Sequence, residues 1–416
     1  MANTTSLGSY ATITANYWAF TLTDGALRML VVLYFHQLGY SPLQIASLFL
    51  FYEIFGIVTN LVGGWLGSRF GLNRCMQIGT ALQIIALLML TVEPGWLSVA
   101  YVMAAQALSG IAKDLNKMGA KAGVKMVAAR GALFRWVAII TGSKNALKGA
   151  GFFLGGALLA AFGFRGALFV LAGGLVLSLA AILILLPSAL GKSRSKPKFR
   201  QLFSKTREIN WLSAARFFLF GARDVWFVVA LPVYFTATLG WQAEQVGSFF
   251  ALWIIGYGIV QSATPVLLRR AHPDGRAAAR WVALLALVPA MIAFALTRGW
   301  PAEMVLLLGL ALFAVIFAIN SALHSYLILA WSHGEKVAGN VGFYYMANAG
   351  GRLAGTLLSG ALYQLWGLVA CLWASALMLA LAMLLSLALP RGGGGGEPGL
   401  AKKGGGGKAG PDEITG

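Results

Sequence analysis

The chain has 416 residues, of which 59% are hydrophobic and only 11% are charged. Its mean hydropathy of +0.76 lies far outside the range of soluble globular proteins, so the composition indicates a protein that crosses a membrane several times. The net charge of +19 falls mostly in short connections between apolar segments, where membrane topology explains it better than a nucleic-acid partner does. Cys75 and Cys371 lie in different apolar segments and indicate neither a disulfide framework nor a metal site.

The apolar residues form twelve runs that are long enough to cross about 30 Å of hydrocarbon. The predicted spans cover residues 15–38, 43–66, 75–92, 96–117, 132–162, 166–187, 210–238, 244–268, 278–297, 300–330, 338–366 and 368–389. No Lys or Arg precedes the first run, so we expect it to insert as a span and not to be a cleaved secretory signal. The predicted fold class is an all-α membrane protein with twelve transmembrane helices.

Lys and Arg are concentrated in alternate loops, and loops of this kind stay in the cytoplasm. The opposite loops hold only Arg165 and Arg298, so we expect both termini to be cytoplasmic. The chain then divides into four regions. These are a six-helix bundle over residues 1–187, a basic cytoplasmic linker over 188–208, a second six-helix bundle over 209–389 and a disordered Gly-rich tail over 390–416.

The two halves of the chain repeat each other. Asp24 matches Asp224, and the stretch GGALLAAFGF recurs 204 residues later as SGALYQLWGL. At this offset of 204 residues, Lys148 falls on Arg352. Twelve spans in two parallel six-span halves, joined by a long basic loop, resemble the major facilitator superfamily. The resemblance implies two pseudo-symmetric bundles with a binding site between them.

Two local patterns support this resemblance. The stretch GWLGSRFGLNR is similar to the superfamily's gating signature after span two, with Ser68 in place of its aspartate. The matching residues are Gly64, Arg69, Gly71 and Arg74. The stretch GFFLGG, residues 151–156, is similar to the antiporter signature of span five, with a phenylalanine in place of proline. This likeness favours efflux, although close helix packing alone also accounts for the glycines.

Charged residues lie within the predicted spans. At 1.5 Å per residue, Arg28 is about 18 Å from the cytoplasmic start of span one, close to the bilayer midplane. The charged residues predicted near this depth are the bases Arg28, Lys144, Lys148, Arg223 and Arg352 and the acids Asp24, Glu53 and Asp224. An excess of two buried positive charges is unfavourable without a partner, which predicts a hydrated site for a multiply anionic substrate.

The basic residues at this depth suggest two sets of contacts. We expect Arg28 and Arg223, from opposite halves, to clamp one oxyanion, because a guanidinium can donate two parallel hydrogen bonds. Lys144 and Lys148 share a helical face, and with Arg352 they are expected to hold a second anionic group.

Each of these charges also has a structural explanation. Asp24 and Arg28 are four residues apart in the favourable order and can neutralise each other. Arg223 and Asp224 are adjacent, point differently around the helix and pair less naturally. The remaining bases can form salt bridges between helices, although three acids cannot cancel five bases. Glu53 is either a hydrogen-bonded structural group or a proton carrier, a role for which Asp24 and Asp224 are also candidates.

Other polar residues are weaker candidates for the same site. Lys113 and Lys117 begin a basic stripe on span four and are expected to draw cytoplasmic anions inward, whereas topology explains Lys121 and Lys125. His324 lies on span ten. Neutral donors on span eleven, of which three share a helical face with Arg352, are Asn340, Tyr344, Tyr345 and Asn348.

Three stretches carry a more specific resemblance. NYWAFTLTDGALRMLVVLYFHQLGYSPLQIA, SGIAKDLNKMGAK and TGSKNALKG resemble the organoarsenical efflux permeases of arsenic-resistance operons, a branch of the facilitator superfamily. The likeness runs from about Asn16 to Pro390. It implies a bacterial inner-membrane protein that exports 1-arseno-3-phosphoglycerate, a product of a companion glyceraldehyde-3-phosphate dehydrogenase that accepts arsenate. We expect a monomer that binds a small anion and needs no cofactor.

Other functions remain open from the sequence. An exchanger of organophosphates or inorganic phosphate needs the same cations. A membrane receptor that does not transport has little use for a cationic site at the midplane. An enzyme is disfavoured, because the chain has no cluster of His, Cys or carboxylate side chains suited to catalysis.

Overall fold

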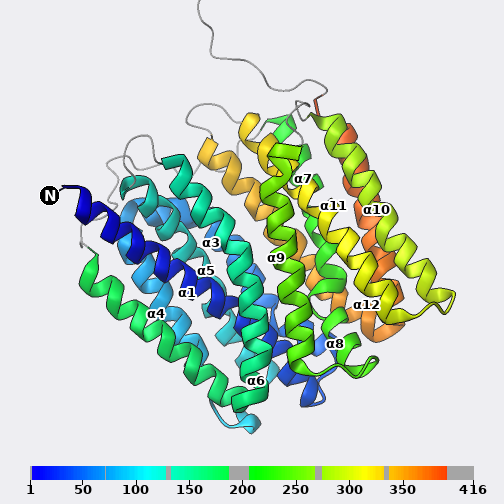
Figure 1. Cartoon of the computed structure of the whole chain (residues 1–416), viewed down its shortest axis with the longest axis horizontal. Helices are drawn as coiled ribbons and strands as arrows, with labels where there is room; N and C mark the ends of the chain where they lie inside the picture. The colour runs from blue at the N-terminus through cyan, green and yellow to red at the C-terminus, as the bar shows by residue number, and fades with distance from the viewer. Residues whose placement is uncertain are drawn as a thin grey trace, which may run out of the picture.

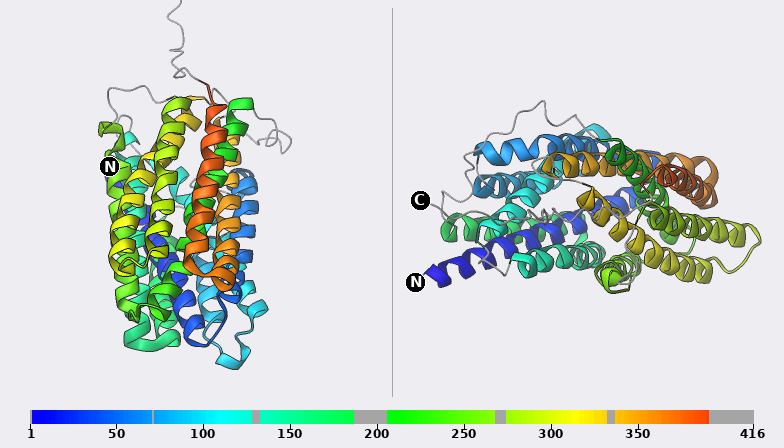
Figure 2. Two further views of the ribbon diagram at one scale, coloured as in Figure 1. Left: turned by 90° about the vertical axis from the view of Figure 1, so that its right-hand side faces the viewer. Right: turned by 90° about the horizontal axis from the view of Figure 1, so that it is seen from above.

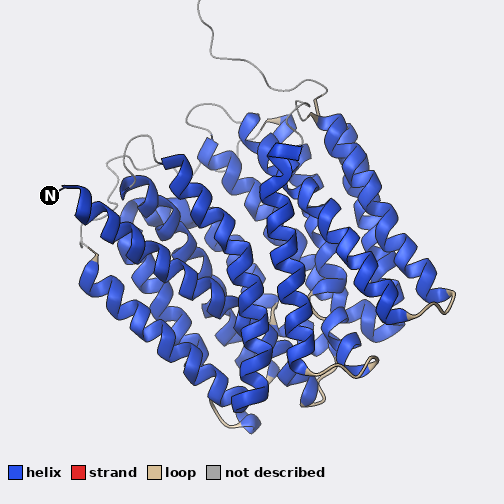
Figure 3. Ribbon diagram, viewed as in Figure 1, coloured by secondary structure: helices blue, strands red, loops and turns tan. Residues whose placement is uncertain are grey.

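The computed structural model describes residues 2–70, 72–127, 133–186, 206–267, 274–331 and 337–390. These residues form helices joined by short turns, with no strand among them (Figure 3). Gly71, most of the predicted linker over 188–208, and the tail beyond Pro390 lie outside the described residues. The expected character of the linker and of the tail therefore stays a prediction.

Each half of the chain contributes one group of long helices (Figure 1). The first half comprises α1 (Ala2–Gln37), α2 (Pro42–Leu48), α3 (Leu50–Phe70), α4 (Leu72–Met89), the short 3-10 helix η1 (Pro94–Trp96), α5 (Val99–Val127) and α6 (Leu133–Leu185). The second half comprises α7 (Arg207–Phe227), α8 (Ala230–Ala237), α9 (Ala243–Leu267), α10 (Gly275–Thr297), α11 (Ala302–Ala330) and α12 (Val337–Leu387).

These helices supply the twelve predicted crossings. Eight segments of the described chain are long and apolar enough to span a membrane, and two of them, Ser143–Leu185 and Asn340–Leu387, have twice the necessary length. Each of these two contains one residue with non-helical dihedral angles, Gly163 at φ 65° and Gly367 at φ 73°, where the chain turns back. Because two of the eight segments cross twice, the eight supply ten crossings. The helices α4 and α5 supply the other two, and the prediction of twelve transmembrane helices is confirmed.

The predicted repeat is visible in the packing. α1 packs along α6 in the first half, as α7 packs along α12 in the second, and α4 against α5 corresponds to α10 against α11. The turns at Gly163 and Gly367 are 204 residues apart, which is the offset found in the sequence. These turns and Gly39 lie at one end of the bundle, called here the far end. The start of α1 and the end of α12 lie at the terminal end.

The two halves meet along two seams, which the view from above shows as neighbouring groups of helices (Figure 2). α6 packs against α9, and α12 packs against α2 and α3. Gly156 and Gly360 occupy equivalent positions in these seams. A Cβ atom would lie 2.5 Å from the Ala243 carbonyl oxygen at position 156 and 2.6 Å from the Pro42 carbonyl oxygen at position 360. The helices therefore approach each other so closely that only glycine fits at both places.

Adding one methyl group at either seam should destabilise the protein. We expect Gly156→Ala and Gly360→Ala to lower the free energy of unfolding by about 1–3 kcal/mol, because backbone atoms must move apart. Gly174 lies in the second crossing of α6, beyond the turn at Gly163, with nothing near its Cβ position, so Gly174→Ala should be neutral or stabilise by up to ~1 kcal/mol. Thermal unfolding of the purified variants measures this difference, and equal effects at positions 156 and 174 would contradict it.

Candidate functional site

Midway along the helices, three arginines and two carboxylates form a continuous chain of ion pairs. Glu53 Oε1 accepts hydrogen bonds from Arg28 Nη2 at 2.8 Å and from Arg352 Nη2 at 2.6 Å. Arg352 Nε also donates to Asp224 Oδ2 at 3.2 Å, and Asp224 Oδ1 accepts from Arg223 Nη2 at 2.5 Å. The chain of ion pairs therefore links α1 and α3 of the first half to α7 and α12 of the second.

This chain of ion pairs is buried and carries one more positive than negative charge. The side chains of Glu53 and Asp224 are 1% and 0% exposed, so neither carboxylate is hydrated from the surface. Aromatic rings face two of the guanidinium groups, with Tyr52 at 5.0 Å from Arg28 and Phe220 at 5.0 Å from Arg223. Such contacts partly offset the desolvation of the excess charge.

A cavity of about 120 Å³ lies beside the ion pairs, with walls from α1, α3, α5, α6 and α12. Its charged lining consists of the bases Lys113, Lys117, Lys144, Lys148 and Arg352 and the acids Asp24, Glu53 and Asp114. The described lining therefore has two more basic than acidic side chains. Lys148 and Arg352, which the repeat relates to each other, reach the cavity from opposite halves.

The acids of the lining differ in their partners. Asp114 lies 3.4 Å from Lys117 Nζ and 4.0 Å from Lys113 Nζ, so it serves both lysines. Asp24 accepts a hydrogen bond from the Tyr52 hydroxyl at 2.6 Å. Lys148 has no carboxylate within 4.0 Å among the described residues, and its Nζ lies 5.6 Å from the ring centre of Phe152.

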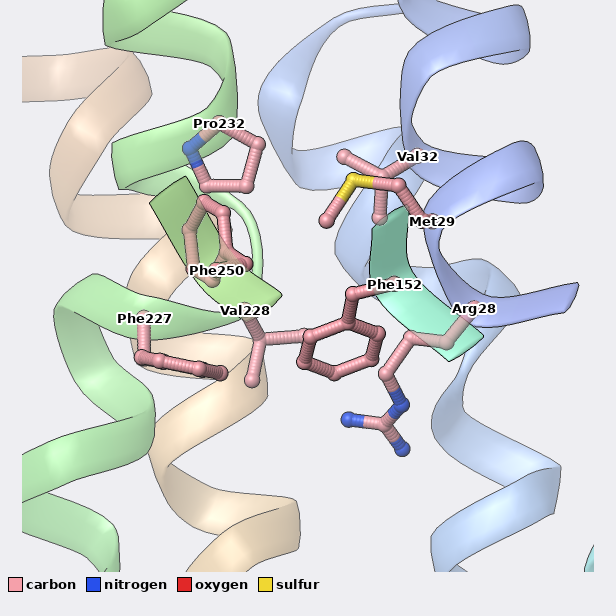
Figure 4. A pocket seen from close by; sticks show the side chains of 8 residues that line it. All are labelled: Arg28, Met29, Val32, Phe152, Phe227, Val228, Pro232 and Phe250. Atoms are coloured by element: carbon pink, nitrogen blue, oxygen red, sulfur yellow. The ribbon is translucent and has the colours of Figure 1, made fainter. Parts of the chain in front are cut away.

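Apolar side chains from both halves pack together beside Arg28 and form a plug between the halves (Figure 4). In α1 and α6 the plug residues follow the cavity residues in the direction of the turns at the far end. The plug consists of Met29, Val32, Phe152, Phe227, Val228, Pro232 and Phe250, which adjoin Arg28. The space left among them is about 10 Å³, no more than one water molecule needs. The cavity thus lies on the terminal side of this apolar plug.

The structure decides between the pairings that the sequence left open for the midplane charges. Arg28 pairs with Glu53 and not with Asp24, because the carboxylate of Asp24 is held by Tyr52. Arg223 does pair with its neighbour Asp224, since the long arginine side chain bends back to the adjacent carboxylate.

The positions of the two predicted clamp residues also differ from the expectation. Neither Arg28 nor Arg223 lines the 120 Å³ cavity. Of the three arginines in the ion-pair chain, Arg352 is the one that reaches it.

The cavity face of α12 also differs from the predicted face. Its cavity residues are Tyr345, Asn348, Ala349 and Arg352, which follow the helical spacing of three and four residues. Tyr344 is fully buried away from the cavity, and so is His324 on α11, whose two ring nitrogens have no hydrogen-bond partner among the described residues. Asn340 is buried as well and does not line the cavity.

Several residues of the site were missed in the sequence. Asp114 stands between Lys113 and Lys117, and this acid within a basic stripe was a usable signal. Tyr52 precedes Glu53 directly and orients Asp24. Asn60 accepts a hydrogen bond from Lys117 at 3.1 Å. A further buried arginine, Arg216, lies two turns before Arg223 on α7.

The predicted gating signature is placed only in part. Gly64 and Arg69 belong to the last turns of α3, and Arg74 is exposed in the first turn of α4. Gly71, between the two helices, lies outside the described residues. The signature therefore sits at a helix junction of the terminal end, and its gating role stays a prediction.

The buried ion pairs should matter far more for stability than exposed ones. We expect Glu53→Gln to lower the free energy of unfolding by about 3–5 kcal/mol, because it leaves two buried guanidinium groups with one anionic partner fewer. Glu93→Gln is the matched control, since Glu93 pairs with Arg165 at the surface. Such an exposed ion pair contributes less than about 1 kcal/mol to stability. Thermal unfolding compares the two, and similar losses in both variants would contradict the assigned role of Glu53.

Comparisons with known proteins agree with this architecture. A family model described as Major Facilitator Superfamily matches residues 13–328. The fold is similar to a bacterial homologue of the iron transporter ferroportin in an inward-facing state, with a TM-score of 0.67 and 17% identity over 92% of this chain and 98% of that chain. It is also similar to a POT family transporter in complex with 5-aminolevulinic acid, with a TM-score of 0.71 and 15% identity over 91% and 94% of the two chains.

A third similar structure is the human organic anion transporter MFSD10, with a TM-score of 0.64 and 20% identity over 92% of this chain and 98% of that chain. No curated protein sequence matches the chain. At these identities the structures show a common fold and nothing about the substrate. The family model, however, covers more than half of the chain, and the protein therefore belongs to the major facilitator superfamily of membrane transporters.

Proposed function

We propose that this protein transports a small organic molecule with two anionic groups, by alternating exposure of the cavity between its halves. The observation that carries the proposal is the cavity lining, in which five basic side chains face three acidic ones. Lys148 and Arg352 bring positive charge from opposite halves, so an anion between them contacts both bundles. Binding energy can then act on the relative position of the halves.

The ion pairs suggest how an anion is received. Arg352 is shared between Glu53 and Asp224, so an incoming oxyanion has to compete with carboxylates that already hold this guanidinium. Lys148 has no such competitor within 4.0 Å among the described residues and offers a first contact. Glu53 Oε2 is buried and unpaired among the described residues, so the carboxylate is incompletely satisfied even before an anion arrives.

The specific substrate that we propose is 1-arseno-3-phosphoglycerate. Its phosphate and arsenate groups match a cavity with separate basic groups, and three stretches of the sequence resemble the permeases that export it. In this proposal, both termini lie on the cytoplasmic side of a bacterial inner membrane. The cavity then lies on the cytoplasmic side of the plug, where an export substrate has to load. The proposal includes a monomeric carrier that acts together with a glyceraldehyde-3-phosphate dehydrogenase.

An exchanger of organophosphates or inorganic phosphate is the second candidate, because the same basic residues suit either anion. Equilibrium binding of 3-phosphoglycerate and of inorganic phosphate to the purified protein separates the two. A carrier for an ester with two anionic groups should bind phosphoglycerate more tightly, whereas a phosphate exchanger should prefer phosphate. A receptor that does not transport would bind an anion without moving it into vesicles.

Removing either of the two repeat-related cations should abolish export. We expect Lys148→Ala and Arg352→Ala to remove the arsenate resistance that the chain confers on cells which also make the dehydrogenase. Arg298→Ala, at the exposed far end, is the control and should leave resistance unchanged. Membrane-protein levels are measured in parallel, and normal resistance in both cavity variants would refute the proposed site.

Proton coupling is a separate part of the proposal, with Asp24, Glu53 and Asp224 as the candidate carriers. In inverted membrane vesicles, we expect collapse of the pH gradient to change the rate at which the organoarsenical is taken up. Flux that is the same with and without the gradient would exclude coupling and leave the anion site intact.

A further inference from the structure

A second polar cluster lies in the second half of the protein, beside the cavity. Its centre is Arg216 on α7, which is only 4% exposed. No carboxylate of the described residues lies within 4.0 Å of this guanidinium. It packs instead on aromatic rings, with its central carbon 3.9 Å from the ring centre of Phe220 and 5.0 Å from that of Tyr344. A buried arginine in this position has to use neutral acceptors for its hydrogen bonds.

Two neutral acceptors are present. Arg216 Nε donates to Asn348 Oδ1 at 3.0 Å, and Nη1 donates to the Ser321 carbonyl oxygen at 3.4 Å. Because an arginine has donors only, it fixes which end of the Asn348 amide it meets. The amide oxygen faces Arg216, and the NH2 group is left for the other side.

The other side of Asn348 is the cavity, which this residue lines. The side chain is partly exposed, and its recorded hydrogen bond uses the oxygen alone. An amide held by a neutral partner can present either its oxygen or its NH2 group to a ligand. Held by Arg216, it presents two N–H donors, which suit an oxyanion and disfavour an ammonium group.

We propose that Arg216 is a positioning residue that holds the Asn348 amide as a donor to an oxyanion of the transported molecule. This inference rests on the proposed function, since Asn348 lines the same cavity. It adds a residue that determines specificity by hydrogen bonding and not by charge, and it assigns a role to an arginine outside the cavity wall.

Further hydrogen bonds are made by Ser321, whose carbonyl oxygen accepts from Arg216. The Ser321 hydroxyl accepts from Tyr257 at 3.0 Å and from Gln261 at 3.2 Å. Gln261 in turn accepts a hydrogen bond of 2.8 Å from Asn145 on α6, across the seam between the halves. A network in which successive members satisfy one another restricts the rotation of each side chain. Ser321, the second acceptor of Arg216, is therefore held by contacts that extend into both halves.

A double-mutant cycle tests the inference on the purified full-length protein. The probe is 3-phosphoglycerate, with its dissociation constant measured by calorimetry for wild type, Asn348→Leu, Arg216→Gln and the double variant. We expect Asn348→Leu to weaken binding about tenfold or more, as for loss of a hydrogen bond to a charged group. Arg216→Gln should weaken binding in the wild type and have no further effect once Asn348 is replaced.

Additive effects in the cycle would overturn the inference, because Arg216 would then act through its charge and not through Asn348. Unchanged binding in Asn348→Leu would overturn it as well. Asn348→Leu leaves the buried guanidinium of Arg216 without its Asn348 acceptor. Asn348→Asp therefore provides a second measurement. It keeps an acceptor for Arg216, so the melting temperature should be at least that of wild type, while binding is again weakened at least tenfold.

The two levels of the proposal fail in different ways. If wild-type protein binds neither 3-phosphoglycerate nor inorganic phosphate, the anion site itself is wrong, and the role of Asn348 is lost with it. If wild type binds and Asn348→Asp binds equally well, only the positioning role is wrong. If Arg216→Gln alone keeps the full affinity of wild type, the positioning role is also wrong.

Discussion

The bridge that Glu53 makes between Arg28 and Arg352 is the contact on which the rest of the site depends. One carboxylate oxygen accepts from guanidinium groups of both halves, and the Glu53 side chain is only 1% exposed. A buried carboxylate and its arginines cannot be separated without replacing the lost partner, because unpaired charges in apolar surroundings are costly. Any movement of one half relative to the other at this level therefore has to be accompanied by an exchange of charged partners.

The glycine seams make such movement compatible with a stable fold. At Gly156 and Gly360 the halves touch through backbone atoms, with no long side chain interlocked between them. The Glu53–Arg352 contact joins α3 to α12 along one of these two seams. The protein thus combines two close helix contacts of equivalent position in the repeat with one ionic contact, beside the cavity that Lys148 and Arg352 line.

The fold could be predicted from the sequence to a large extent. Long apolar runs fixed the number of crossings, and the offset of 204 residues reappears in the turns at Gly163 and Gly367. The depth of charged residues along a span was also predictable, because helix rise is constant. For this reason Lys144, Lys148 and Arg352 were expected together, and all three line the cavity.

The pairing of the charges could not be predicted in the same way. Depth along a helix does not state the direction in which a side chain points, and one residue changes that direction by about 100°. Tyr344 was expected in the cavity, and Tyr345 is found there. The partner of Arg28 depended on the rotation of α3 and on Tyr52 holding Asp24. Arg216 carried no motif, and its contact with Asn348 joins residues 132 positions apart.

The aromatic plug has a consequence for the membrane in which such a carrier sits. Phe152 stands where the similar antiporter signature has proline, and it meets Phe227 and Phe250 from the other half at 6.2 Å and 6.1 Å between ring centres. These three rings pack together beside a space of about 10 Å³, which holds at most one water molecule. An apolar plug of this kind opposes the passage of protons and salt ions through a resting carrier, which lets a cell hold many copies without dissipating its gradients.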